Sequence, residues 1–190
     1  EAIGKLRNGS ILVAGTGSGK SLTSLFYFRK VIGDGQSCSS EPQKNMDLYI
    51  ITTAKKRNDL DWLKDCSMVG LGPGGYPGTT VVVDSWNNIK KYVDVSNAFF
   101  IFDEQKSVGS GTWSKSMIKI AKKNRWLMLT ATPGDRWIDY VSVFVAHGFY
   151  RNRTEFIKRH VVYHPHVTFP MIKGYMFENE LKTYLDSILV

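Results

Sequence analysis

The sequence predicts an α/β fold in which a mostly parallel sheet is flanked by helices on both faces. Short apolar runs of four to six residues recur along the chain, and they mostly lack the period-two alternation of half-exposed strands. Stretches with helical spacing separate these runs, as parallel strands require. The 190 residues, 43% of them apolar, are enough to form one domain with a proper core.

Five runs rich in Val, Ile and Phe are expected to be buried strands, at residues 11–14, 48–52, 80–83, 98–102 and 126–129. Helices are expected at residues 21–31, 58–64, 87–92, 114–122, 138–146 and 175–190. Residues 33–45 and 70–78 are rich in Gly, Ser and Pro, so both segments are expected to be exposed connections.

The strongest chemical signal is the segment AGTGSGKS, which joins the first strand to the first helix. Glycines let the backbone fold tightly so that its N–H groups converge on a phosphate, and the positive end of the following helix adds to the attraction. The segment predicts a P-loop for ATP, in which Lys20 reaches the β- and γ-phosphates and the Ser21 hydroxyl binds Mg²⁺. The expected nucleotide-binding residues are Gly15, Thr16, Gly17, Ser18, Gly19, Lys20 and Ser21.

A second signal is the run FFIFDE, in which an apolar strand ends in two acids. A parallel sheet binds ligands at the carboxyl edge of its strands, so both carboxylates are expected to face the nucleotide. Asp103 is expected to hold Mg²⁺, and Glu104 is expected to orient and activate the attacking water. With Lys20, these two acids form the predicted catalytic set.

A third signal, LTATP, lies at the end of the last strand. Thr130 and Thr132 are expected to relay the state of the γ-phosphate through hydrogen bonds of their hydroxyl groups, and Pro133 is expected to end the strand.

Taken together, AGTGSGKS, IFDEQ and LTATP resemble motifs I, II and III of the first RecA-like lobe of superfamily 2 helicases and translocases. The resemblance runs from about residue 9 to about residue 140. Residues 51–55 look like motif Ia, residues 83–88 lie where motif Ib falls, and residues 135–161 are similar to the segment after motif III in SNF2-type proteins. The whole looks like the compact helicases of phages and prophages. Gln105 and Lys106 follow the acidic pair, so neither the DEAD nor the DEAH subclass is assigned.

The resemblance implies a RecA-like P-loop lobe over residues 1–170, which hydrolyses ATP to move on or remodel DNA; RNA is also possible. Residues 171–190 are then a helix that leads toward a second RecA-like lobe in the same or another chain. That lobe would supply an arginine finger, so this chain is expected to bind ATP and to hydrolyse it weakly. The residues that fall at nucleic-acid contacts are Thr53, Lys55, Ser85 and Asn88.

The formal net charge is +8, and basic residues gather in two clusters, at residues 115–125 and 151–159. Each cluster is either a nucleic-acid surface or a solvated helix face. Two other functions stay open. One is a nucleotide-gated module that binds nucleic acid or a partner without motor activity, and the other is a small-molecule kinase, against which stand the LTATP segment and the lack of an Arg-rich lid.

The remaining residue types point away from other classes of site. Cys38 and Cys66 have no metal ligands at short spacing, so reduced thiols and a cytoplasmic location are expected, in a host cytoplasm if the protein is phage-encoded. The four His residues lack a nearby acid or Cys, which argues against zinc. Trp126 is expected in the core, whereas Trp86 and Trp113 are either core residues or stacking platforms. No run of about eighteen apolar residues is present to cross a bilayer.

Overall fold

The computed structural model describes residues 2–15, 17–30, 46–72, 79–104, 111–132, 134–165 and 169–190. A five-stranded sheet with the order β1-β5-β4-β2-β3 forms its centre, and every neighbouring pair of strands is parallel. The strands are β1 (Ile11–Val13), β2 (Leu48–Thr52), β3 (Val81–Ser85), β4 (Phe99–Asp103) and β5 (Arg125–Thr130). The predicted α/β fold class is therefore confirmed, and each predicted strand is present within two residues of its expected bounds.

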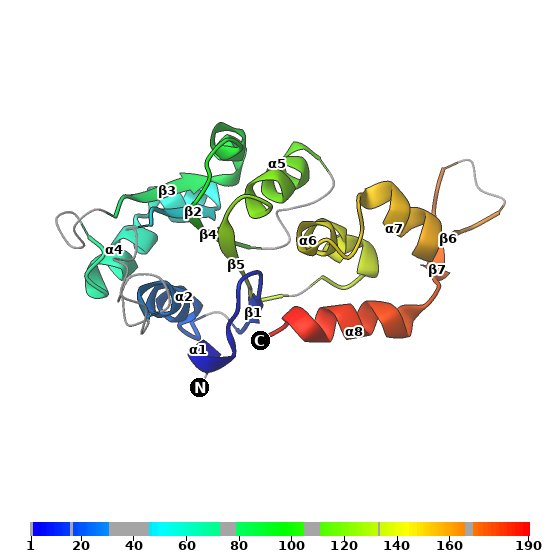
Figure 1. Ribbon diagram of the computed structural model, residues 1–190, viewed down its shortest axis with the longest axis horizontal. Coiled ribbons are helices and arrows are strands. Elements are labelled where there is room, and N and C mark those ends of the chain that lie inside the picture. The colour runs from blue at the N-terminus through cyan, green and yellow to red at the C-terminus, as the bar shows by residue number, and fades with distance from the viewer. Residues whose placement is uncertain are drawn as a thin grey trace.

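Helices cover both faces of this sheet (Figure 1). On one face lie α1 (Ala2–Lys5), α2 (Lys20–Phe28) and α4 (Asp61–Met68), and on the other lie η2 (Trp86–Tyr92), α5 (Thr112–Ala121) and α6 (Val141–His147). Successive side chains of a strand point to opposite faces. Phe99 and Ile101 of β4 therefore join the core beneath α2 and α4, whereas Phe100 and Phe102 join the core beneath α5 and α6.

Several helices differ in detail from the prediction. The expected helix at residues 58–64 is two helices, α3 (Ala54–Asn58) and α4, and Leu60 between them has a left-handed backbone with φ 58°. The expected helices at 87–92 and 138–146 contain 3₁₀ turns, in η2 and in η4 (Trp137–Tyr140). The predicted connection at 33–45 and most of the one at 70–78 lie outside the described residues.

A second, smaller sheet was not predicted. After α7 (Arg153–His160), the antiparallel strands β6 (Val161–Tyr163) and β7 (Ile172–Tyr175) lead to α8 (Glu178–Ile188). The His160 ring fixes this arrangement, because one ring nitrogen lies 2.7 Å from the Tyr150 hydroxyl and the other 2.8 Å from the Met176 carbonyl. The sequence placed the boundary between the lobe and the C-terminal helix after residue 170. That boundary falls in the connection between these two paired strands.

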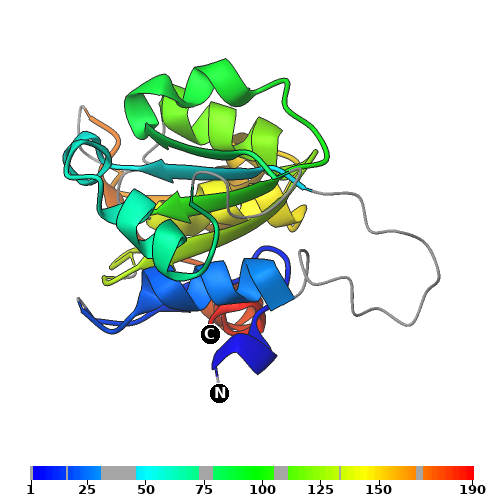
Figure 2. The ribbon, with the colours of Figure 1, turned by 90° about the vertical axis from the view of Figure 1, so that its left-hand side faces the viewer.

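The C-terminal residues return to the central sheet. Val190 donates its N–H to the Ile11 carbonyl (3.0 Å) and accepts from the Val13 N–H (2.9 Å), so the chain end extends the sheet beyond β1. Figures 1 and 2 both place the C-terminus beside the N-terminal segment, with α8 running back from the small sheet. None of the helices in the described part of the chain is long and apolar enough to cross a bilayer.

Candidate nucleotide-binding site

The glycine-rich segment lies between β1 and α2, as its sequence predicts. Gly17 and Gly19 have φ values of 76° and 80°, in the left-handed region that glycine adopts without strain. An added Cβ at either position would meet no atom within 4 Å, so backbone conformation rather than crowding requires glycine here. The Lys20 ammonium folds back on its own loop and donates to the carbonyls of Ala14 (2.5 Å) and Gly15 (2.6 Å). Thr16 lies outside the described residues.

The acidic pair lies at the carboxyl end of β4. Asp103 is 4% exposed, and its carbonyl accepts a hydrogen bond from the Trp86 indole at 2.8 Å. Glu104 has a left-handed backbone with φ 73°, and its N–H donates to the Leu129 carbonyl of β5 at 3.0 Å. A non-glycine residue in this region is strained, and such strain concentrates at functional sites.

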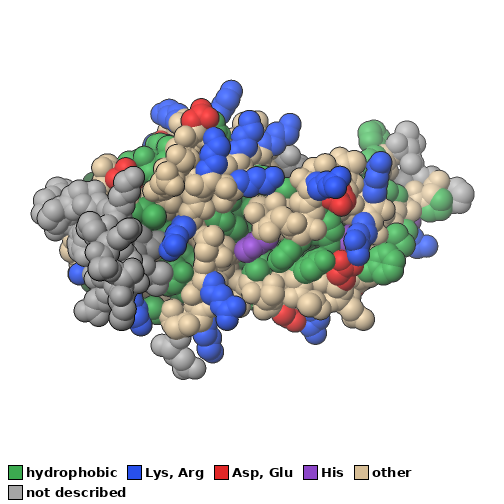
Figure 3. Space-filling view, in the orientation of Figure 1, with side chains coloured by type: hydrophobic (Ala, Val, Ile, Leu, Met, Phe, Trp, Pro, Cys, Tyr) green, Lys and Arg blue, Asp and Glu red, His purple; other side chains and the backbone are tan. Residues whose placement is uncertain are grey.

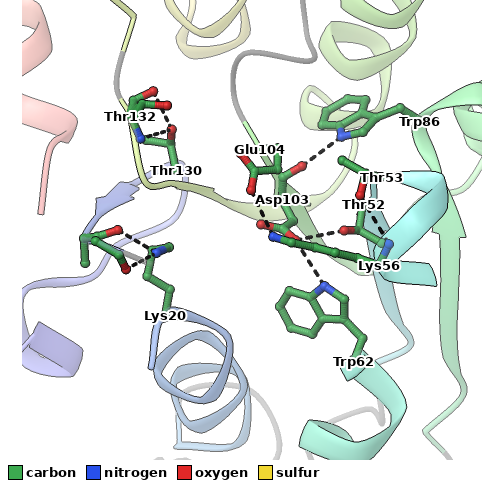
Figure 4. A network of polar contacts seen from close by, with 12 residues as sticks. Lys20, Thr52, Thr53, Lys56, Trp62, Trp86, Asp103, Glu104, Thr130 and Thr132 are labelled. Atoms are coloured by element: carbon green, nitrogen blue, oxygen red, sulfur yellow. Dashed lines mark hydrogen bonds and ion pairs between the residues drawn. The ribbon is translucent and has the colours of Figure 1, made fainter. Parts of the chain in front are cut away.

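Three side chains converge on the Oδ2 atom of Asp103. The Thr52 hydroxyl donates at 2.8 Å, the Trp62 indole at 3.2 Å and the Lys56 ammonium at 3.0 Å. Lys56 also reaches Oε1 of Glu104 at 2.9 Å, so one ammonium bridges both carboxylates (Figure 4). These donors come from the end of β2 and from α3 and α4.

The two acids stabilise the charged form of Lys56. Burial alone would lower the pKa of Lys56, but the attraction of Asp103 and Glu104 outweighs burial and raises the pKa above its ordinary value. Lys56 is therefore an ammonium at neutral pH. Its side chain is 41% exposed, which leaves it room to move.

A cavity of about 380 Å³ joins the glycine-rich loop to the acidic pair. Its volume lies in the range of small-molecule sites. The structure thus brings Lys20 and Ser21 into one cavity with Asp103 and Glu104, as the sequence predicts. Within the described part of the chain, the lining residues are Gly17, Ser18, Gly19, Lys20, Ser21, Leu22, Lys56, Asp65, Asp103, Glu104 and Ala131.

Asp65 of α4 adds a third carboxylate to this cavity. Burial raises the pKa of Asp65 above its ordinary value, as does the negative charge of Asp61, while a hydrogen bond from the Ser21 side chain opposes both effects. Asp65 therefore lies in the same cavity as Ser21, whose hydroxyl was predicted to bind the metal ion.

The two threonines of the third segment bond to each other and do not line the cavity. The buried Thr130 hydroxyl donates to the Thr132 carbonyl at 2.8 Å and accepts from the Thr132 N–H at 3.2 Å. Ala131 between them does line the cavity. Because β5 lies between β1 and β4, this turn sits between the glycine-rich loop and the acidic pair.

The residues predicted for nucleic-acid contact lie at or just after the carboxyl ends of β2 and β3, at the same edge of the sheet. Lys55 is exposed, and the Thr53 hydroxyl caps α3 by accepting from the Lys56 N–H at 3.3 Å. Asn88 donates to Asp84 at 2.8 Å. Ser85 is only 2% exposed, so its side chain offers almost no surface to a ligand in this conformation.

The Asp84 carboxylate accepts several hydrogen bonds near the carboxyl end of β3. Burial alone would raise the pKa of the Asp84 carboxyl, but hydrogen bonds from Asn88, Tyr92, the Ser85 N–H and Arg57 outweigh burial and lower that pKa. The Arg57 guanidinium lies 3.3 Å from the Asp84 carboxylate and links α3 to the end of β3.

The donor atoms of the cavity fit Mg²⁺, which prefers oxygen ligands and is usually held by one or two carboxylates together with substrate phosphates. The Ser21 hydroxyl and the Asp103 carboxylate are such donors. Among the described residues, no group of three or more His, Cys, Asp or Glu side chains could hold a metal ion by itself. Oxygen donors of this kind suit a metal ion that also binds the phosphates of a substrate.

Sequence reasoning missed three of the residues that build the site, Lys56, Trp62 and Asp65. Trp86, which it left open, is a buried residue that holds the Asp103 carbonyl, and Trp126 is in the core as predicted. Cys66 is a buried free thiol whose pKa burial raises to about 12, and Cys38 lies outside the described residues.

Two solved structures are similar to this chain over most of its length. The Sulfolobus solfataricus SWI2/SNF2 ATPase core in complex with dsDNA matches with a TM-score of 0.68 and 15% identity, over 100% of this chain and 41% of that one. The Pyrococcus furiosus Hef helicase domain matches with a TM-score of 0.54 and 13% identity, over 82% of this chain and 38% of that one. The fold is therefore that of a RecA-like helicase lobe, and the chain spans about two-fifths of either structure.

No protein-family model and no curated protein sequence matches this chain.

Proposed function

We propose that this RecA-like lobe binds ATP with Mg²⁺ and belongs to a DNA-dependent ATPase of the helicase or translocase type. The observation that carries the proposal is the single cavity in which a glycine-rich loop and a strand-end acidic pair face each other (Figure 4). That pairing suits a metal–nucleotide complex, since the loop can hold phosphates and the acids can hold the cation.

Most of the residues predicted from the sequence have a role in the proposed reaction. Lys20 turns from its own loop carbonyls to the β- and γ-phosphates. The N–H groups of residues 17–21 surround these phosphates. Ser21 and Asp103 hold Mg²⁺, which neutralises phosphate charge when it is bound. Glu104 orients the attacking water and accepts its proton. Thr130 and Thr132 link the cavity to the rest of the lobe through the turn that carries Ala131.

The proposed site is half of a complete motor. Phosphoryl transfer in this class of protein is accelerated by about 10³- to 10⁵-fold by an arginine that a second element supplies. We infer that a second RecA-like lobe, in the same or another chain, brings that arginine to the open side of the cavity. The lobe alone is then a good nucleotide binder and a slow hydrolase.

Two surfaces support nucleic acid as the partner. The exposed Lys55 lies at the same sheet edge as the cavity, as do Thr53 and Asn88. A second group of exposed basic side chains covers α5 and η2 (Figure 3), at Lys90, Lys91, Lys115, Lys119, Lys122, Lys123 and Arg125. Such surfaces attract phosphate backbones and release counterions. One of the similar structures is itself a complex with dsDNA.

The test is ATP turnover by the longest natural form of the protein, measured with increasing double-stranded DNA, single-stranded DNA and RNA. The proposal predicts that DNA raises the turnover number at least tenfold, and that Glu104→Gln abolishes this increase. A flat response to every nucleic acid, with ATP binding intact, would instead favour the nucleotide-gated binding module.

A further inference from the structure

The acidic pair of the cavity already has a cation. The Lys56 ammonium lies 3.0 Å from Asp103 Oδ2 and 2.9 Å from Glu104 Oε1, which are distances of direct ion pairs. Lys56 also lines the cavity, so this ion pair lies inside the space proposed for the nucleotide. Lys56 and Asp103 are 47 residues apart in the sequence. Helix α3 places Lys56 beside the acidic pair.

Two cations compete for the same carboxylate under the proposed function. Asp103 is the proposed ligand of Mg²⁺, and the Thr52 and Trp62 donors fix its carboxylate in place. Adjacent like charges are costly, so a divalent ion at Asp103 disfavours an ammonium on the same oxygen. The Lys56 side chain is 41% exposed, whereas that of Asp103 is 5% exposed, so the lysine is the partner that can withdraw.

The ammonium also balances the charge of the cavity. Without Lys56, the carboxylates of Asp65, Asp103 and Glu104 would face Lys20 as the only basic side chain among the described residues that line the cavity. Lys20 lies on its own loop carbonyls rather than on the acids. A nucleotide that arrives without a metal ion brings several more negative charges, and Lys56 is then the cation that compensates the acidic pair.

We propose that Lys56 is an exchangeable counter-ion and a positioning residue of this site: it compensates Asp103 and Glu104 until nucleotide-bound Mg²⁺ takes its place at Asp103. The inference rests on the proposed nucleotide-binding function. It predicts that Lys56 makes nucleotide binding less dependent on Mg²⁺ than the acidic pair alone would allow.

The experiment measures this dependence as one ratio, the Kd of the ATP analogue AMP-PNP in EDTA divided by its Kd in MgCl₂. Competition against a fluorescent ATP analogue gives both values for the 190-residue chain. Lys56→Met removes the ammonium and keeps the length of the side chain. We expect the ratio to rise about tenfold in this variant, because metal-free nucleotide then meets two uncompensated carboxylates.

Two further variants serve as controls. Lys64→Met removes the same charge from the exposed face of α4, where Lys64 pairs only loosely with Asp61 at 3.6 Å, and it should leave the ratio unchanged. Lys56→Arg keeps the charge and should keep the parent ratio. If Lys56→Met does not fold, Lys56→Gln replaces it, since its amide can still donate to Glu104 while the charge is lost.

The outcomes separate the two proposals. A ratio in Lys56→Met that equals or falls below that of the parent would overturn the exchange, even if all variants bind the analogue. Failure of the parent and of Lys64→Met to bind in either buffer would overturn the nucleotide site itself, and the exchange with it.

Discussion

At the scale of single residues, the site depends on a few side chains that other parts of the chain hold in place. Asp103 is fixed on both sides, because its carboxylate accepts from Thr52 and Trp62 and its carbonyl accepts from Trp86. Hydrogen bonds to an ionised group are stronger than neutral ones, so this carboxylate is held more rigidly than a strand end usually is. Rigid positioning is what electrostatic catalysis requires.

Glu104 gives a prediction about strain. Its φ of 73° costs a residue with a side chain about 1 kcal/mol, whereas glycine adopts it freely. We compare Glu104→Gly with Glu104→Ala, because both remove the carboxylate and only Ala keeps the strain. Glu104→Gly should have the higher free energy of unfolding, by about 1 kcal/mol in urea denaturation. The reverse order, which is usual at ordinary backbone positions, would argue against strain at Glu104.

Some residues of the site could be predicted from the sequence, and others could not. The glycine-rich loop could be identified because its chemistry lies in eight consecutive residues, and the acidic pair because it ends an apolar run. Lys56, Trp62 and Asp65 could not, since only the packing of α3 and α4 against the ends of β2 and β4 brings them to the cavity. The spacing of Lys56 four residues after Thr52 is a local clue, but the sequence does not distinguish it from the adjacent Lys55.

At the scale of elements, patterns of burial decided which parts could be predicted. The central strands are buried on both faces, so they appear in the sequence as continuous apolar runs. The β6–β7 hairpin is short, and polar or small residues such as Lys173 and Gly174 interrupt it, so no strand pattern is visible. Helix α7 was not among the expected helices, because half of its residues are charged and its buried residues are Phe156 and His160.

The contact of His147 in α6 with Gly9, which precedes β1, predicts how the free energy of unfolding depends on pH. The His147 ring lies between Trp126 and Phe149, and its Nε2 lies 2.9 Å from the Gly9 carbonyl. Burial lowers the pKa of His147, while the Gly9 carbonyl opposes this in part. Below about pH 6.5 the unfolded chain therefore binds a proton here that the folded chain does not, and the free energy of unfolding should decrease as the pH falls.

Thermal unfolding between pH 7.5 and pH 5.5 tests this expectation. His147→Gln should show a smaller loss of Tm over this range than the parent, because its side chain does not titrate. His164→Gln is the matched control, since His164 is exposed, and it should behave as the parent does. Equal losses in all three proteins would show that His147 does not contribute to the pH dependence.

At the scale of the whole molecule, a continuous sheet separates two cores and presents the cavity at one edge. The core beneath α5 and α6 extends to Leu181 and Ile188 of α8, so the C-terminal helix is packed into the lobe. The two residues after α8, Leu189 and Val190, pair with β1, the strand that leads into the glycine-rich loop. The C-terminal end of the described chain is therefore tied to the strand that leads into the glycine-rich loop.

The most direct measurement is the titration of the 190-residue chain with AMP-PNP and Mg²⁺, alongside Lys20→Ala and Lys30→Ala. Lys30 is an exposed lysine just beyond α2, outside the cavity lining, and serves as the control for loss of charge. The parent and Lys30→Ala should bind the analogue equally, and Lys20→Ala should bind it at least about 100-fold more weakly, because the phosphates lose their direct cation. Equal binding by folded Lys20→Ala and the parent would contradict the assignment of this cavity to a nucleotide.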